Sequence, residues 1–231
     1  MKHSARRPLC GFLLTIAFAC CASAQNQPVP EDVRAFAARY VAAINAKDAS
    51  RILALYNSQS LACITPQNKD FYDTVMPIHP SDHVPPGYTV SLLPVNENNL
   101  KALADTETFP LKPLNELHID YQQGEESGTV IIWLVRENGR LVGDFPCATE
   151  SALKQYRDQA PERKELEAHY KALADGIQQP LRDELLAMLR DHKRSSAITR
   201  YREASGQDFK TAIFVLNDLQ QDLAQQLDLA R

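Results

Sequence analysis

The residues best placed to do chemistry lie on one face of a predicted strand. Residues 117–122 alternate between apolar and polar types, which puts His118 and Asp120 on the same face. A carboxylate that is desolvated in a cavity acts as a base or binds a ligand by hydrogen bonds. Three further side chains are candidates for the same cavity, namely Tyr40, Tyr56 and Asp144. A solvent-exposed face is the competing interpretation, because half-buried strands alternate in this way without any function.

A second group of polar residues has the composition of a metal site but not its spacing. His79, Asp82 and His83 lie within one short segment. Pro80 interrupts that segment, so the two histidines cannot be assumed to share one helical face. No cluster of cysteines or carboxylates completes a ligand set. We therefore expect a polar surface loop here and no metal site.

The cysteines point to a structural bridge. Three of the five cysteines fall within the first 24 residues, which leaves Cys63 and Cys147. Two cysteines in an exported protein are more often bonded than reactive. In the chain-entropy model, a bridge across this loop stabilises the fold by about 4 to 5 kcal/mol. We predict a Cys63–Cys147 disulfide and no catalytic thiol.

The first residues have the three parts of an export signal. A basic start is followed by an apolar stretch over residues 9–21 and by the small residues Ala22-Ser23-Ala24. The apolar stretch is too short to span a bilayer, and the small residues match a signal-peptidase site. We expect residues 1–24 to be removed after Ala24, and the mature protein to be periplasmic or secreted. A lipoprotein anchored at Cys20 or Cys21 is the alternative.

Charge divides the chain and excludes one class of partner. The net charge of the full chain is -4, and it becomes -7 once the three basic residues of the signal are removed. A binder of nucleic acid needs a basic stripe, so we expect no nucleic-acid partner. Residues 25–150 hold 9 basic and 16 acidic side chains, whereas residues 151–231 hold 13 of each.

A local group of basic residues consists of Arg190, His192, Lys193, Arg194, Arg200 and Arg202. We expect a solvated helix face there, with an anionic lipid or acidic partner as the alternative.

The pattern of residues 25–150 predicts an α+β domain. Apolar residues recur at helical spacing over residues 31–46, and Asp48 is a cap for a second helix that ends near Asn57. Residues 61–65 are expected to form a strand containing Cys63. Residues 66–87 contain five prolines and are expected to be irregular.

The second half of this domain predicts an antiparallel sheet. We expect a strand over 88–95 and a short helix over 96–105, then strands over 117–122, 128–135 and 141–147. The sequence Asn138-Gly139 predicts a tight hairpin turn between the last two strands. The strand containing Trp133 is apolar throughout, so both of its faces must be covered, one of them by the N-terminal helices. The fold class predicted is therefore α+β, with N-terminal helices on a curved antiparallel sheet.

Residues 151–231 predict an all-helical region that follows the sheet. Three apolar stripes indicate three helices, over residues 166–177, 181–189 and 209–227. The last stripe packs either inside this region or against a second copy of the chain, so a homodimer is possible. Beyond the signal, no apolar stretch is long enough to cross a membrane.

The N-terminal domain resembles the nuclear transport factor two-like superfamily, the cone-shaped fold shared with ketosteroid isomerase. The resemblance covers residues 28–150 and rests on the helix from Val33 to Asp48, the short Ile52-Leu53-Ala54-Leu55-Tyr56 segment and the late meander. It implies a cone whose cavity holds a small ligand, and it matches no catalytic residue position by position. The proline-rich loop and the C-terminal helices depart from the family pattern.

Two functions remain open on this evidence. The sequence contains no phosphate-binding glycine loop, serine nucleophile elbow or paired CxxC motif, and we expect no cofactor. We prefer a non-enzymatic exported protein that binds a small apolar ligand or an envelope protein. The ligand-binding residues predicted are Tyr40, Tyr56, His118, Asp120 and Trp133. The alternative is an acid/base enzyme of the ketosteroid-isomerase-like type, whose catalytic candidates are Asp120, His118 and Tyr56.

Overall fold

A computed structural model describes residues 28–76 and 83–229 of the chain. The N-terminal part begins with four helices, which are α1 (Glu31–Asn45), α2 (Ala49–Leu53), α3 (Ser58–Ala62) and α4 (Lys69–Val75). Helix α1 follows its predicted apolar stripe, and the stripe is buried. The Asp48 side chain accepts a hydrogen bond from the Arg51 backbone N–H and so caps α2, as predicted.

The sheet that follows is antiparallel. Its four strands are β1 (Thr89–Pro94), β3 (Asn115–Gln123), β4 (Glu126–Glu137) and β5 (Arg140–Asp144), in the order β1-β3-β4-β5. Helix α5 (Glu97–Leu103) follows β1, and the short strands β2 (Glu107–Thr108) and β6 (Cys147–Ala148) form a separate pair. Asn138 and Gly139 both have positive φ, of 50° and 80°. These values confirm the predicted tight turn between β4 and β5.

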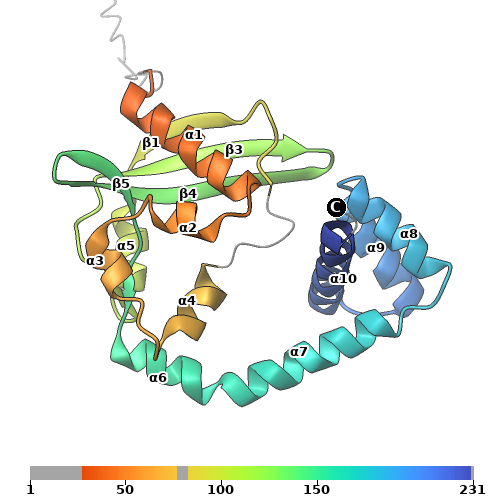
Figure 1. Ribbon diagram of the computed structural model, residues 1–231. Coiled ribbons are helices and arrows are strands. Elements are labelled where there is room, and N and C mark those ends of the chain that lie inside the picture. The colour runs from red at the N-terminus through yellow and green to blue at the C-terminus, as the bar shows by residue number, and fades with distance from the viewer. Residues whose placement is uncertain (1–27, 77–82, 230–231) are drawn as a thin grey trace, which may run out of the picture.

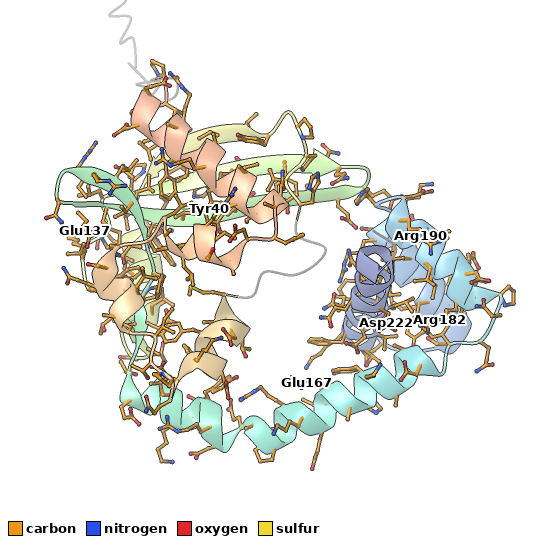
Figure 2. The ribbon with its side chains drawn as sticks, viewed as in Figure 1. Tyr40, Glu137, Glu167, Arg182, Arg190 and Asp222 are labelled. Carbon is orange, nitrogen blue, oxygen red and sulfur yellow. A yellow bond between two sulfur atoms is a disulfide. The ribbon has the colours of Figure 1, made fainter. Side chains whose placement is uncertain are left out.

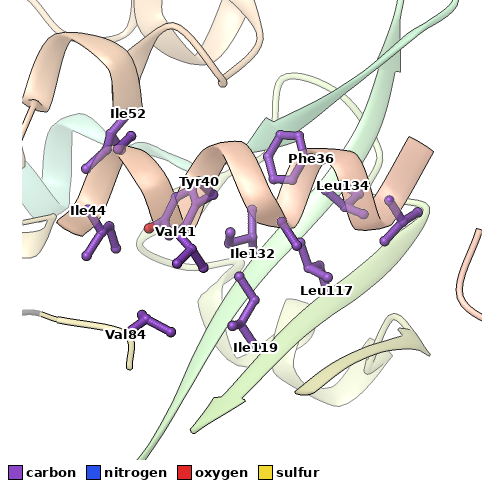
Figure 3. Packing of buried hydrophobic residues seen from close by; sticks show 13 residues of the cluster. Phe36, Tyr40, Val41, Ile44, Ile52, Val84, Leu117, Ile119, Ile132 and Leu134 are labelled. Atoms are coloured by element: carbon purple, nitrogen blue, oxygen red, sulfur yellow. The ribbon is translucent and has the colours of Figure 1, made fainter. Parts of the chain in front are cut away.

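Helix α1 lies across one face of this sheet and supplies the first core (Figure 3). Phe36 is fully buried on the helix, above Leu117 of β3 and Leu134 of β4. The opposite face of β4 is only partly covered, because Ile131 there remains 52% exposed. The prediction that both faces of this strand are covered is therefore wrong at Ile131, on the face that points away from α1.

A short segment before α3 extends the sheet beyond β5. The Asn57 backbone N–H donates to the Gly143 carbonyl at 2.9 Å, and the Gly143 N–H donates to the Leu55 carbonyl at 2.8 Å. Tyr56 thereby lies beside Gly143 as a parallel neighbour. This pairing places Tyr56, which follows α2, beside the C-terminal end of β5.

The C-terminal region is helical, with α6 (Glu150–Asp158), α7 (Ala160–Asp175), α8 (Leu181–Arg190), α9 (Arg194–Ser205) and α10 (Phe209–Leu229). Helices α6 and α7 lead away from the sheet, and α8, α9 and α10 pack together at the far end of α7 (Figure 1). Their buried apolar residues form a second core. Arg182 of α8 binds Asp222 of α10 at 3.2 Å and donates to the Ala174 carbonyl of α7 at 2.8 Å, which joins three helices (Figure 2).

The tip of the β3–β4 hairpin contacts these C-terminal helices. The Glu125 backbone N–H donates to the His192 carbonyl at 3.0 Å. The Glu125 carboxylate also accepts from the Ser196 hydroxyl at 2.8 Å and from the Ser196 backbone N–H, at the start of α9. A carboxylate at a helix N-terminus is favourable because the N–H groups there lack partners within the helix.

Two local predictions were wrong in the segment before β1. Residues 61–65 do not form a strand, because the Asn57 side chain accepts from the Ser60 N–H and starts α3, which ends with Cys63 as its cap. The segment predicted to be irregular contains α4. Its prolines flank this helix and do not lie inside it.

The C-terminal region contains two helices, α6 and α9, in addition to the three that the apolar stripes indicated. Helix α6 begins at Thr149, whose hydroxyl caps it, and it buries only Leu153. Helix α9 buries Ala197, Ile198 and Tyr201 and is polar elsewhere. Such short apolar stripes fall below what periodicity detects.

The α+β class predicted for the chain is confirmed, together with the helices that follow the sheet. Within the described ranges, no helix has the length and apolar character that crossing a bilayer requires.

Candidate functional site

A cavity of about 1050 Å³ lies between the N-terminal helices and the free edge of β4. Strand β5 pairs with β4 only as far as Trp133, which faces Asp144, and the chain then turns away toward β6. Val130, Ile131 and Ile132 of β4 precede that point and line the cavity. The remaining wall is largely apolar, and α1, α2 and α4 contribute about half of its residues. Pockets of this size and character hold small molecules.

Two tyrosine hydroxyls interact in this cavity. Tyr40 comes from α1, and Tyr56 is held beside β5 by the backbone pairing described above. Burial raises the pKa of Tyr56 well above its ordinary value, and the hydrogen bond with Tyr40 and the charge of Asp144 raise it further. Both tyrosines were predicted to bind ligand, and both line the cavity.

Asp144 is the most buried acidic side chain of the site, at 1% exposure. One of its carboxylate oxygens, Oδ1, accepts a hydrogen bond from Asn57 Nδ2 at 2.6 Å and another from the Ser60 hydroxyl. The other oxygen, Oδ2, is buried and has no hydrogen-bond partner among the described residues. Burial raises the pKa of Asp144, although hydrogen bonds from Ser60, from Asn57 and from the Phe145 backbone N–H oppose that rise.

Trp133 lies directly opposite Asp144 in the register of β4 and β5. Its ring packs edge-on against Phe109, with the ring centroids 5.0 Å apart. The indole nitrogen Nε1 is buried and, within the part of the chain that is described, has no hydrogen-bond acceptor. Trp133 was predicted to contact ligand, and it lines the cavity.

A second acidic side chain, Glu107 of β2, also lines the cavity. Burial raises the pKa of Glu107, and burial is likewise the main reason that the pKa of the neighbouring Tyr72 is raised. The Tyr72 hydroxyl accepts from the Ala148 backbone N–H at 3.0 Å. Clusters of groups whose pKa is shifted by burial are typical of functional sites.

His118 and Asp120 do not line this cavity. Their neighbours Leu117 and Ile119 are buried beneath α1, so the two polar side chains point to the opposite face of the sheet. There His118 Nε2 lies 3.2 Å from Glu116 Oε2, and Asp120 accepts from the Thr129 hydroxyl at 2.6 Å. In the register of β3 and β4, His118 lies opposite Ile131, so a residue of β4 that lines the cavity separates His118 from it.

Only part of the histidine-rich segment lies within the described residues. His79 and Asp82 lie outside the described residues, whereas His83 is exposed and lines the cavity. In the described ranges, no group of three or more histidine, cysteine or acidic side chains is arranged to hold a metal ion.

The predicted disulfide between Cys63 and Cys147 is confirmed. It joins the end of α3 to the start of β6 across 84 positions of sequence. Ile64 and Pro146, which adjoin the two cysteines, line the cavity. The disulfide therefore ties together two parts of the cavity wall.

The basic residues near the C-terminus are largely engaged within the protein. Arg194 donates to Gln220 at 2.5 Å and to Asn217, and burial lowers the pKa of its guanidinium. Arg200 binds Glu184 at 2.9 Å. These contacts favour the interpretation of the group as part of a helical surface and not as a docking site.

Several residues of the site were not predicted from sequence, Tyr72 among them. Asn57 and Ser60 position Asp144, and Glu107 adds a second acid. The sequence offered a signal for Asn57 alone, since asparagine is a favoured N-cap residue at a helix start. No local signal marks Glu107, because only the pairing of β2 with β6 brings it to the cavity.

Comparison with protein-family models, curated proteins and solved structures finds no match to this chain. The resemblance to the nuclear transport factor two-like superfamily therefore stays a prediction.

Proposed function

We propose that this protein is exported and binds a small, largely apolar ligand in the cavity beside the free edge of β4. The single observation that carries the proposal is the cavity itself, with about 1050 Å³ of space, apolar walls and a few converging polar groups. Small-molecule sites combine an apolar surface with a small number of placed polar atoms in this way. Its polar groups include the hydroxyls of Tyr40 and Tyr56 and the carboxyl groups of Glu107 and Asp144, residues that all line the cavity.

Export is supported by the disulfide, because such bonds persist in oxidising compartments and are rare in the cytoplasm. The mass of the intact native protein tests this part of the proposal. A chain that begins at Gln25 with both remaining cysteines oxidised is expected. A chain that begins at Met1 with Cys63 and Cys147 free would overturn it.

Ligand binding is tested by native mass spectrometry of protein purified from its own cells. We expect an additional mass that is released by organic solvent. Ala49 lines the cavity, and Ala49→Phe should displace the bound molecule by filling part of its space. The matched control is Ala38→Phe, an exposed alanine of α1 that lies outside the cavity, which should leave the added mass unchanged. A ligand-free monomer from native cells would count against the proposal.

An acid/base enzyme is the second candidate, and one observation favours it. Burial raises the pKa of both Asp144 and Tyr56, and both line the cavity. A carboxyl group with a raised pKa can hold a proton and transfer it near neutral pH. On this alternative, the acid is Asp144 and neither Asp120 nor His118. The test is exchange of carbon-bound hydrogen next to the carbonyl of a ketone probe in D2O, which Asp144→Asn should abolish.

A further inference from the structure

The first half of β4 has a neighbouring strand on one side only. Strand β3 pairs with β4 along residues 126–134, whereas β5 pairs with it only along residues 133–137. Among the described residues, no further strand joins the sheet beside the first half of β4 (Figure 1). Residues 126–132 therefore form an open strand edge.

The register fixes which backbone groups face this open edge. Gln123 and Glu126 flank the two-residue turn of the β3–β4 hairpin, so they exchange backbone hydrogen bonds across it. In an antiparallel pair, such positions alternate with positions whose N–H and C=O groups point away from the partner strand. The positions that point away from β3 are therefore Ser127, Thr129 and Ile131. Within the described ranges, no other group bonds to the main chain at these three positions.

The open edge lacks the features that normally prevent a strand from pairing. Ser127, Thr129 and Ile131 are all exposed, and no charged residue or proline occurs in residues 127–135. Edge strands of folded proteins usually carry charges, prolines or bulges that discourage an added strand. The other outer strand of the sheet, β1, differs because it ends at Pro94 and contributes no residue to the cavity.

The cavity lies directly beside the open edge. Val130, Ile131 and Ile132 line it. Successive side chains of an extended chain point to opposite faces, so a chain paired with β4 would direct alternate side chains toward the cavity. The cavity wall is largely apolar, and its acidic residues Glu107 and Asp144 disfavour an acidic side chain. Peptide recognition by strand addition combines main-chain hydrogen bonds with a pocket for alternate side chains in this way.

We infer that the open edge of β4 binds a short extended peptide segment of a partner protein, with an apolar side chain in the cavity. This inference rests on the proposed function and gives its ligand a peptide backbone. Only an extended backbone supplies donors and acceptors at the two-residue spacing of the open positions.

The length of the open edge favours a short segment over a second folded copy of this chain. Residues 126–132 span about 20 Å as a strand. Both ends of the edge are occupied, because Glu126 Oε2 lies 3.6 Å from His192 Nδ1 and Trp133 pairs with Asp144. A short peptide fits between these ends, whereas the helices and loops that flank β4 in a second copy would meet them.

Calorimetry with N-methylated peptides tests strand addition on the full-length, disulfide-bonded protein. The probe is acetyl-Lys-Thr-Val-Thr-Val-Thr-Lys-amide, in which either both valines or the last two threonines are N-methylated. An added strand bonds to β4 through alternate residues only. We therefore expect one methylated peptide to bind like the parent and the other to bind roughly tenfold more weakly or worse. The peptide cannot reverse its faces without loss, because valine and threonine side chains differ in the cavity. Equal effects of the two methylation patterns would overturn strand addition.

Thr129→Pro tests the protein side of the same contact. The change removes an N–H group at the open edge and none of the bonds to β3, so it should weaken peptide binding roughly tenfold. The matched control is Thr129→Val, which keeps the N–H group and should leave the affinity unchanged. The methylated peptides need no variant, so the test does not depend on how the proline variant folds.

The outcomes separate the inference from the proposed function, with 1-decanol as a small apolar probe of the cavity. Peptide binding that only one methylation pattern weakens upholds both. Binding of 1-decanol without binding of the peptide overturns the inference and leaves the cavity as a binding site. Binding of neither probe overturns both. A dimer in sedimentation that Thr129→Pro converts to a monomer would assign the edge to a second copy and overturn the inference.

Discussion

Gly124, at the tip of the β3–β4 hairpin, lies against the backbone of His192 in the C-terminal helices. A Cβ atom placed on Gly124 would come 2.9 Å from the His192 carbonyl oxygen and 3.0 Å from the His192 Cβ. Gly124 also has a φ of 60°, and His192 has a φ of 55°. The hairpin and the helices approach this closely because residue 124 has no side chain.

Gly124→Ala is expected to loosen the contact between the hairpin and the C-terminal helices. The change combines an unfavourable φ with a steric clash against backbone, which together cost about 1 to 3 kcal/mol. Hydrogen exchange should show faster exchange at Glu125 and at the start of α9. The matched control is Gly139→Ala, where φ is also positive but no atom lies within 4 Å of the new Cβ. Equal effects of both changes would show that the close approach to His192 contributes nothing.

Asp144 is expected to make the stability of the fold depend on pH. Because burial raises the pKa of Asp144, the folded protein binds this proton more tightly than the unfolded chain does. The free energy of unfolding should therefore fall as pH rises from the ordinary pKa of aspartate through the raised value.

Urea unfolding at about pH 4 to 7 measures this slope, and Asp144→Asn should reduce it. Burial also raises the pKa of Glu107, so a slope of the same sign should remain in Asp144→Asn. Adding Glu107→Gln is expected to reduce it further. An unchanged slope in the double variant would contradict the assignment of this pH dependence to the cavity acids.

The Cys63–Cys147 disulfide is expected to be a major source of stability. It closes a loop across 84 positions, for which the chain-entropy model gives about 4 to 5 kcal/mol. A reductant should lower the urea midpoint of the native protein accordingly. The same reductant should leave a Cys63→Ser, Cys147→Ser double variant unaffected, and a midpoint that did not move on reduction would contradict the prediction.

Tyr56 is expected to be displaced by any side chain at Gly143. A Cβ atom at Gly143 would lie 2.9 Å from two carbons of the Tyr56 ring and 3.3 Å from Ile132 Cγ2. Gly143→Ala should therefore cost about 1 to 3 kcal/mol of stability and weaken ligand binding, because the Tyr56 ring must move into the cavity. A double-mutant cycle checks the cause. In a Tyr56→Ala background the same change should cost much less, and an equal cost in both backgrounds would rule out the ring contact.

Local patterns in the sequence were enough for several elements. The apolar spacing of α1, the alternation of β3 and the Asn138-Gly139 turn each depend on neighbours within a few residues. The pairing of Cys63 with Cys147 followed from counting, since only two cysteines remain after the predicted signal. These features can be predicted from the sequence because each depends on residues close together in the chain or, for the disulfide, because only one pairing is possible.

The composition of the candidate site depended on tertiary structure. His118 and Asp120 share a face, as the alternation predicted, but neither lines the cavity, because the cavity lies beside the free edge of β4, where β5 has left that strand. Asp144 and Glu107 reach the cavity through strand pairings with residues distant in sequence. Sequence spacing determines which side chains point the same way, whereas burial, and with it the raised pKa of Asp144, arises only when separate elements close around them.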